Sequence, residues 1–229
     1  MFLEGYAPLI MSGTWVTIKL AVLSLLLSVL MGLVGASSKL SSSRLLSGLS
    51  TAYTTLIRSI PDLVIMLLLF YSIQIFLNHI TEWLEVDQII INPFVAGVVT
   101  LSFIYGAYFT ETFRGAFQSV PRGSIEAAVA YGMSPGEVFK RVLFPQMMRF
   151  ALPGIGNNWQ VLIKATALVS IIGLSDIVKA TQDAGKGSMQ LFYFTIVGAF
   201  IYLTITTISS IVLTWLEHRY SVGVRKAEL

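Results

Sequence analysis

Long runs of apolar residues alternate with short polar stretches along most of this chain. Three apolar segments contain no Asp, Glu, Lys or Arg and are long enough to cross a bilayer, which takes about 20 helical residues: 20–38, 89–110 and 189–216. Two more are interrupted by charge, one by Arg58 and Asp62 and the other by Lys164. The pattern predicts an all-α integral membrane protein whose five membrane-spanning helices lie at roughly 10–36, 50–78, 93–117, 146–174 and 190–215.

The composition favours a membrane protein over a soluble one. Hydrophobic residues make up 55% of the chain and charged residues 12%, and the mean hydropathy is +0.78. We therefore predict one transmembrane domain over residues 1–229, with a core at about 11–215. The chain has no cysteine, which excludes disulfides, thiolate metal sites and a cysteine nucleophile. His79 and His218 are expected near opposite membrane faces, so we expect no metal site and no catalytic activity in this chain.

The positions of Lys and Arg predict the orientation, because cytoplasmic loops are enriched in these residues. With the N-terminus outside, the outer loop 79–92 has no Lys or Arg, and the outer loop 176–188 has two Lys offset by two Asp. The cytoplasmic segments then hold most of the basic residues: Lys39, Arg44, Arg114, Arg122, Lys140, Arg141, Arg149, Arg219, Arg225 and Lys226. We predict a periplasmic N-terminus and a cytoplasmic C-terminus. The same bias explains the net charge of +3 without any nucleic-acid binding.

A polar loop at about 121–145 separates the third and fourth predicted spans. Gly132 is suited to end a helix, and Ser134 is suited to cap a second one that begins with Pro135 and closes a capping box with Glu137. The loop is therefore predicted to hold two short helices joined by a sharp bend. A polar loop of this length between membrane spans indicates that another protein docks there.

The residue types in the first half of this loop suit a docking helix. Ala127 and Ala128 are small enough to let a partner's backbone approach, and Glu126 offers a fixed charge to a partner Arg or Lys. Gly132 permits a turn that a Cβ atom would obstruct. The alternative is an ordinary amphipathic loop helix with a glycine stop.

The spacing of these residues resembles that of a known coupling loop. Gly132 follows the second alanine of Glu126-Ala127-Ala128 by four residues, and Pro145, at the start of the fourth span, follows Gly132 by thirteen. This order is similar to the cytoplasmic EAA loop of ABC importer permeases. The resemblance implies that these five residues couple the chain to a separate ATPase.

Further segments resemble the polar amino-acid uptake branch of the same family, which includes importers of histidine, lysine, arginine and ornithine. They are the stretches 58–61, 108–115 and 157–168, so the resemblance covers essentially the whole chain. It implies a type I ABC importer permease fold in the bacterial inner membrane and transport of basic L-amino acids. It also implies three partners: a homologous permease forming a heterodimer, two copies of an ABC ATPase, and a periplasmic amino-acid-binding protein.

Charged residues inside the second span need a partner or a function, because insertion of each costs at least about 2.5–3.5 kcal/mol. Arg58 and Asp62 are four residues apart, and on a continuous helix they would form an ion pair on one face. Alternatively, Pro61 breaks the helix. The freed amides of residues 62–64 would then receive a substrate carboxylate at a helix N-terminus, and Asp62 would meet a cation. Both interpretations stay open from the sequence.

Polar residues in the third and fourth spans are further candidates. Asn157 and Asn158 are either interhelical hydrogen-bonding groups or ligands. Because the resemblance places them in a segment that lines the transport pathway, we predict substrate contact. Glu111 and Arg114, near the end of the third span, are predicted to form an ion pair.

Competing functions remain. A permease for another polar amino acid such as glutamine fits most of the same observations. A secondary transporter would need an internal inverted repeat or several membrane carboxylates, and the spans offer only Asp62 and Glu111. A membrane enzyme lacks a catalytic cluster. The stretch 184–188 departs from the phosphate-loop motif, so we expect no cofactor in this chain and ATP bound by the partner subunit.

Overall fold

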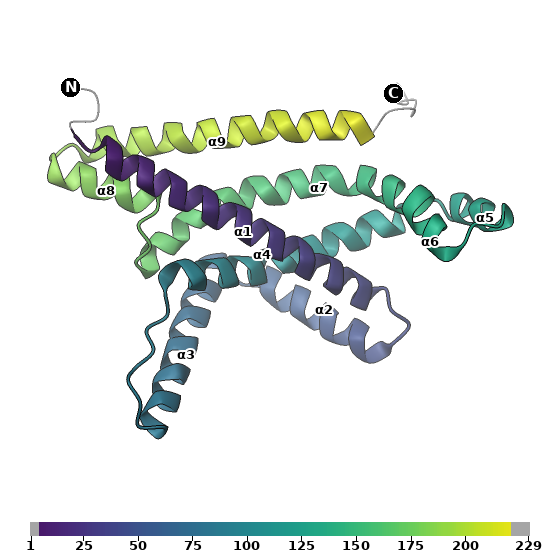
Figure 1. Cartoon of the computed structure of the whole chain (residues 1–229), viewed down its shortest axis with the longest axis horizontal. Coiled ribbons are helices and arrows are strands. Elements are labelled where there is room, and N and C mark those ends of the chain that lie inside the picture. Colours follow the sequence, from purple (N-terminus) through teal and green to yellow (C-terminus); the bar gives the residue numbers. More distant parts are fainter. Residues whose placement is uncertain (1–4, 221–229) are drawn as a thin grey trace.

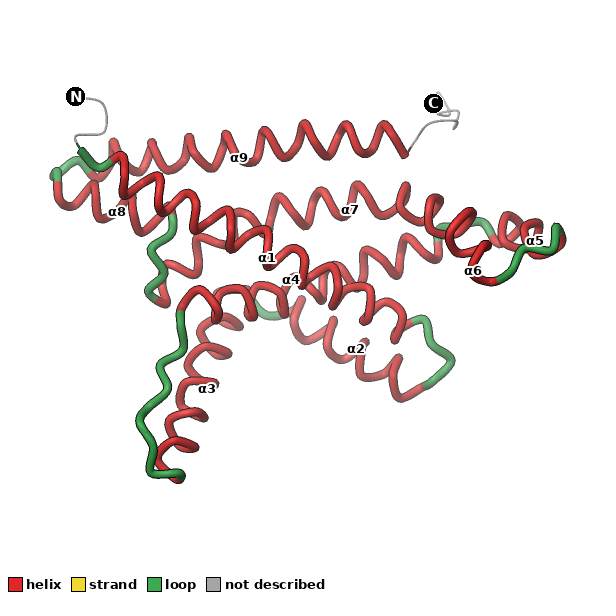
Figure 2. Tube along the Cα trace, viewed as in Figure 1, coloured by secondary structure: helices red, strands yellow, loops and turns green. Residues whose placement is uncertain are grey.

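The computed structural model describes residues 5–220, and every regular element in this range is helical (Figures 1 and 2). The predicted all-α fold is confirmed. A π-helical turn, Phe139–Leu143, joins α6 to α7, and a 3-10 helix, Thr166–Ile172, continues α7. The α-helices are α1 (Ala7–Lys39), α2 (Arg44–Ser59), α3 (Asp62–Trp83), α4 (Pro93–Gln118), α5 (Arg122–Ala130), α6 (Pro135–Val138), α7 (Phe144–Ala165), α8 (Ile177–Gly187) and α9 (Leu191–Tyr220).

Four long helices form the body of the molecule. α1 packs along α4, α4 packs on α7, and α7 packs on α9. At one end of this body α8 lies beside the first turns of α1 and α9, and at the opposite end α5 and α6 extend beyond the long helices (Figure 1). α3 projects away from the body, where it leaves most of its surface uncovered (Figure 1).

Small residues allow α1 and α4 to approach closely. Ala36 is fully buried, and a Cβ atom added to Gly32 or Gly35 would overlap Phe109 or Thr110 of α4. Lipid removes most of the hydrophobic drive for helices to associate, so close packing of this kind is a main source of stability in membranes. The α1–α4 contact is therefore the structural centre of the fold.

Gly32→Ala should destabilise the protein although alanine is the better helix former. The added methyl group must displace Phe109, and overpacking of this kind costs about 1–3 kcal/mol. Gly115→Ala is the matched control on α4, because nothing lies within 4 Å of the Cβ position of Gly115, and it should leave stability unchanged or raised. Thermal unfolding of the two purified variants measures the difference; equal melting temperatures would contradict this packing.

The predicted second span is two helices. α2 ends at Ser59, Ile60 and Pro61 are extended, and α3 begins at Asp62 in a new direction (Figure 1). Proline forces the residue before it out of the helical region and donates no amide hydrogen bond, so the break follows from Pro61. The continuous helix at 50–78 was wrong, and the alternative that Pro61 breaks it is confirmed. Of these two helices, α3 is long and apolar enough to cross a membrane and α2 is not.

The prediction of an outer loop at 176–188 was also wrong, because most of this segment forms helix α8. Ile177, Ala180, Thr181 and Ala184 recur every three or four residues and are buried, because they face α1 and α9. The polar residues between them hid this amphipathic period in a search for long apolar runs.

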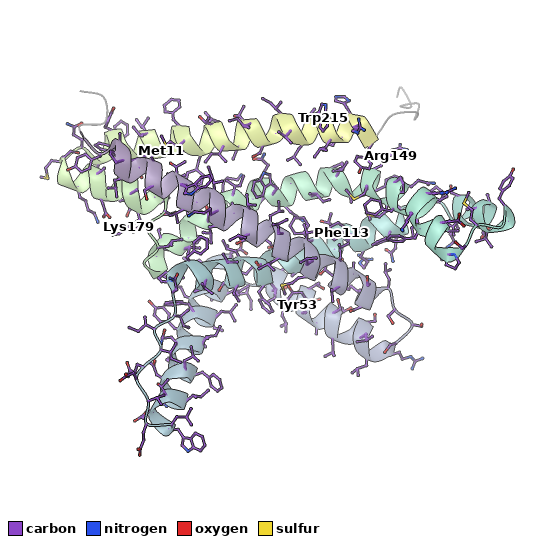
Figure 3. The ribbon with its side chains drawn as sticks, in the orientation of Figure 1. Met11, Tyr53, Phe113, Arg149, Lys179 and Trp215 are labelled. Carbon is purple, nitrogen blue, oxygen red and sulfur yellow. The ribbon has the colours of Figure 1, made fainter. Side chains whose placement is uncertain are left out.

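The outer surface of the helices is that of a multi-pass membrane protein. α1, α3, α4 and α9 are each long and apolar enough to cross a bilayer, and the helical stretch Pro135–Ile172 and α8, which meet at 56°, make a fifth crossing if the bent pair counts as one broken span. Apolar side chains of α1 and α9 point outward, as Met11 and Trp215 do in Figure 3, with 72% and 60% of their surface exposed. Exposed side chains of this kind suit contact with lipid.

Candidate functional site

The helix break at Pro61 separates Arg58 from Asp62. The predicted ion pair between Arg58 and Asp62 does not form, because the two residues belong to different helices and have different neighbours. The Arg58 guanidinium lies 5.3 Å from the ring centre of Tyr108, and the Asp62 carboxylate accepts a hydrogen bond from the Tyr105 hydroxyl at 2.9 Å. No ion pair joins Arg58 and Asp62 in the part of the chain that the structure describes.

Two tyrosines of α4 therefore hold the two charges of the break. The rings of Tyr105 and Tyr108 stack with their centres 5.6 Å apart, so one tyrosine faces the cation and the other hydrogen-bonds to the anion. Tyr105 is 1% exposed. α2 is fixed to the same helix by Tyr53, labelled in Figure 3, whose hydroxyl donates to the carbonyl of Phe103 at 2.5 Å. The arrangement presents a positive and a negative group on either side of a helix break.

The start of α3 offers part of the expected amide site. The amide of Val64 donates to the carbonyl of Pro61 at 2.9 Å and is already used. The amides of Asp62 and Leu63 come first in the helix and have no acceptor within it. Two of the three amides predicted to meet a carboxylate thus remain suited to that role, at the positive end of the helix dipole.

A polar cavity of about 440 Å³ opens beside Arg58. Glu111 lies in its wall, bound to Lys39 of α1 and, at 2.8 Å, to Arg114. The predicted pair of Glu111 and Arg114 is confirmed. Lys39 also donates to the hydroxyl of Thr54 at 2.8 Å, so one charged network ties the ends of α1, α2 and α4 together. The cavity is lined by Lys39, Thr54, Thr55, Arg58, Ser59, Tyr108 and Glu111.

Asn157 and Asn158 have different surroundings because adjacent residues of a helix point in different directions. Asn158 is 8% exposed, and its amide donates to the hydroxyl of Thr112 at 3.0 Å. Asn158 therefore connects α7 to α4. Asn157 is exposed, and neither asparagine lines the cavity at Arg58. The structure brings Arg58 and Asp62 to one break and leaves the two asparagines apart from it.

The polar loop folds as predicted into two short helices with a bend. Gly132, with φ +78°, follows α5, and α6 begins at Pro135. The amide and hydroxyl of Ser134 donate to the Glu137 carboxylate at 3.0 and 2.8 Å, which confirms the capping box. These bonds, with help from Arg141, hold the pKa of Glu137 below its usual range. The charged cap is therefore complete at neutral pH and is lost only as the pH falls through this lowered pKa.

The loop presents a mixed polar and apolar surface. Ala128 is buried against the rest of the loop, whereas Glu126 and Ala127 are exposed. Beside them Val129 is 59% and Tyr131 87% exposed. Apolar side chains exposed on a loop that extends beyond the membrane helices indicate a protein-binding surface (Figure 1).

Pro145 lies at the start of α7, where it was expected, but the chain before it is already helical. α6, the π-helical turn Phe139–Leu143 and α7 follow one another without a loop. Pro145 cannot donate a hydrogen bond to the preceding turn, and the wider π-helical turn lies immediately before it. The docking loop is thus joined to the fourth span by continuous helix.

Sequence reasoning missed Tyr105 and Lys39. Tyr105 lies in an apolar span, where an aromatic side chain is usually a packing residue; the signal was its hydroxyl group, three residues from that of Tyr108. Lys39 meets Glu111 across 72 residues of sequence, and no local pattern indicates such a contact.

Known proteins resemble this chain over nearly its whole length. The family model described as "Binding-protein-dependent transport system inner membrane component" matches residues 13–222. The histidine/lysine/arginine/ornithine transport system permease protein HisQ of Escherichia coli (strain K12) is 60% identical over 227 residues, 99% of this chain and 100% of the relative. The arginine ABC transporter permease protein ArtQ of the same organism is 33% identical over 221 residues, 91% of this chain and 93% of the relative.

A solved structure has the same fold. A chain in the crystal structure of an amino acid ABC transporter with histidines superposes with a TM-score of 0.78 at 32% identity, and the match covers 93% of this chain and 95% of that one.

Proposed function

We propose that this chain, which belongs to the family of inner membrane components of binding-protein-dependent transport systems, is the permease subunit of an ATP-driven importer of histidine, lysine, arginine and ornithine. One observation carries the proposal: 60% identity over the full length to a permease named for these four substrates. The exposed loop and the charged helix break fit that function, since one can meet an ATPase and the other a zwitterion with a cationic side chain.

The proposed substrate site is the break at Pro61. Arg58 and the amides of Asp62 and Leu63 would bind the carboxylate of the amino acid, and Asp62 would bind its cationic side chain; the exposed charge at the break supports this assignment. The two groups are held apart by stacked tyrosines, as a ligand with charges at both ends requires. Asn157, exposed on α7, is a further candidate contact, whereas Asn158 has a structural hydrogen bond.

The proposed partners are an ATPase, a second permease and a periplasmic binding protein. The stretch 184–188 comprises the last turn of α8 and its C-cap Ser188 and offers no phosphate-binding loop, so we assign ATP to a separate ATPase, present in two copies. A homologous permease would cover the uncovered surface of α3, which gives a heterodimer. A periplasmic binding protein would deliver the amino acid to the ends of α1 and α9 near α8.

Coupling would pass through the loop at about 121–145. In the proposed orientation the N-terminus is periplasmic and the loop is cytoplasmic, where Glu126 and Ala127 would contact the ATPase, while buried Ala128 and the bend at Gly132 would hold them in position. Motion of the loop would move α7 as well, because helix continues from α6 through Pro145. Transport of this kind needs two arrangements of the spans that the two ends bias differently.

The test is uptake by the complete transporter. The chain is co-expressed with its permease, ATPase and binding-protein partners and reconstituted in proteoliposomes, and radiolabelled lysine uptake is measured. We expect uptake that requires both ATP and the binding protein and that histidine, arginine and ornithine suppress. Competition by glutamine alone would assign another substrate, and uptake driven by an ion gradient without ATP would make the protein a secondary transporter.

A further inference from the structure

The junction between the 3-10 helix and α8 buries a carboxyl group outside the proposed substrate path. Asp176 has none of its surface exposed. Its Oδ1 accepts a hydrogen bond from the amide of Lys179 at 2.9 Å and so caps α8. Its Oδ2 is buried and has no hydrogen-bond partner. Buried polar atoms almost always form hydrogen bonds, so an oxygen without one needs an explanation.

Hydroxyl groups, and no cation, surround this carboxyl group. Thr17 of α1 accepts a hydrogen bond from the amide of Ile177 at 3.1 Å. Thr166 of the 3-10 helix lies 3.3 Å from the hydroxyl of Tyr202, the titratable group that α9 presents to Asp176. Lys179 of α8 is paired with Asp183 at 3.2 Å instead. Among the residues that the structure describes, no basic side chain pairs with Asp176.

The junction is also tightly closed. A Cβ atom on Gly13 of α1 would lie 2.6 Å from the backbone oxygen of Asp176 and 2.9 Å from the Cβ of Ala180. The start of α8 therefore sits directly on the backbone of α1. A bare charge in such a place is costly without a paired cation.

We propose that Asp176 is a proton-binding site that keeps the start of α8 seated on α1. A proton on Oδ2 removes the charge and converts the unpartnered acceptor into a donor. Loss of the proton favours a second conformation in which α8 lifts and the carboxylate reaches water. On the proposed orientation α8 lies at the outer face, so outer pH would bias the outer end of the transporter; this consequence alone rests on the proposed function.

The pH range follows from the burial of the site. Burial without a paired cation disfavours the charged form of a carboxyl group, so the seated state holds its proton to a higher pH than the open state does. A raised acid pKa means that the seated state binds more protons than the open one. Its extra stability is therefore complete below the usual Asp pKa, near 3.9, and is lost progressively as the pH rises above it.

The absence of cysteine allows a direct test with single-cysteine variants of the purified transporter complex in detergent. Ala184→Cys reports on the buried face of α8, and Gln182→Cys on its exposed face. The ratio of their maleimide labelling rates removes the intrinsic pH dependence of the reagent. We expect this ratio to rise roughly tenfold from pH 5 to pH 7. In Asp176→Asn, which keeps the capping oxygen and cannot titrate, it should stay constant.

Two results would overturn the proposal. One is a labelling ratio that is independent of pH with Asp176 present. The other is the same rise in Asp176→Asn, which would assign the effect to another group. The labelling measurement needs neither transport nor a membrane potential. Its outcome is therefore independent of the substrate and the orientation proposed above.

Discussion

Gly132→Val should abolish the stimulation of ATP hydrolysis by the loaded binding protein while the complex still assembles. Gly132 has φ +78°, and its amide donates to the carbonyl of Val129 at 2.9 Å, which closes the end of α5. A non-glycine residue in the left-handed region costs about 1–2 kcal/mol, and a β-branched one is a clear outlier there. The strain is relieved if α5 turns away from α6. The docking surface of Glu126 and Ala127 then loses its position.

Gly136→Val is the matched control. Gly136 lies in α6 with an ordinary helical backbone, and neither glycine has any atom within 4 Å of its Cβ position. The two variants therefore add the same side chain to open space and differ in backbone conformation. We expect stimulated ATPase activity to fall by about tenfold or more in Gly132→Val and by less than about twofold in Gly136→Val. Equal activities would remove the bend from the coupling account.

Asp62→Asn should remove most transport of lysine and arginine. Asparagine keeps nearly the same shape and can still accept the hydrogen bond from Tyr105, so the break itself should survive. What is lost is the negative charge. Hydrogen bonds to charged groups are worth about 1.5–3 kcal/mol, so we expect uptake at low substrate concentration to fall between about tenfold and a hundredfold.

Glu82→Gln controls for the loss of one carboxylate from the same helix. Glu82 lies in the last turn of α3 and is exposed, far along the helix from the break. Its replacement should leave lysine uptake unchanged. If Asp62→Asn transports lysine as well as Glu82→Gln does, Asp62 has only a structural role and the proposed substrate site is wrong.

The membrane helices were predictable because their signal is local. Apolar runs of sufficient length located α1, α4 and α9, and the cap and turn residues of the loop fixed its bend at Gly132. These features depend on neighbouring residues within one or two turns of the chain. The break at Pro61 is local as well, because it follows from the proline itself, although the sequence left a continuous helix open as the alternative.

The contacts of the candidate site were less predictable because they join distant segments. Asp62 and Arg58 looked like partners at a spacing of four, but each is held by a tyrosine more than 40 residues away in the sequence. The roles of Asn157 and Asn158 could not be told apart, since the difference is the direction in which each points from α7. Helix α8 was missed because polar residues separate its buried positions, so no long apolar run marks it.

The central claim is that the loop at 122–145 contacts the ATPase on the cytoplasmic side. Cross-linking from a single cysteine tests it, since the chain has none of its own. Ala127→Cys and Gln182→Cys are both exposed and lie at opposite ends of the molecule. A thiol-to-amine cross-linker applied to the assembled transporter should join position 127, and not position 182, to the ATPase subunit. Cross-links to the ATPase from 182 with none from 127 would contradict both the coupling role and the orientation.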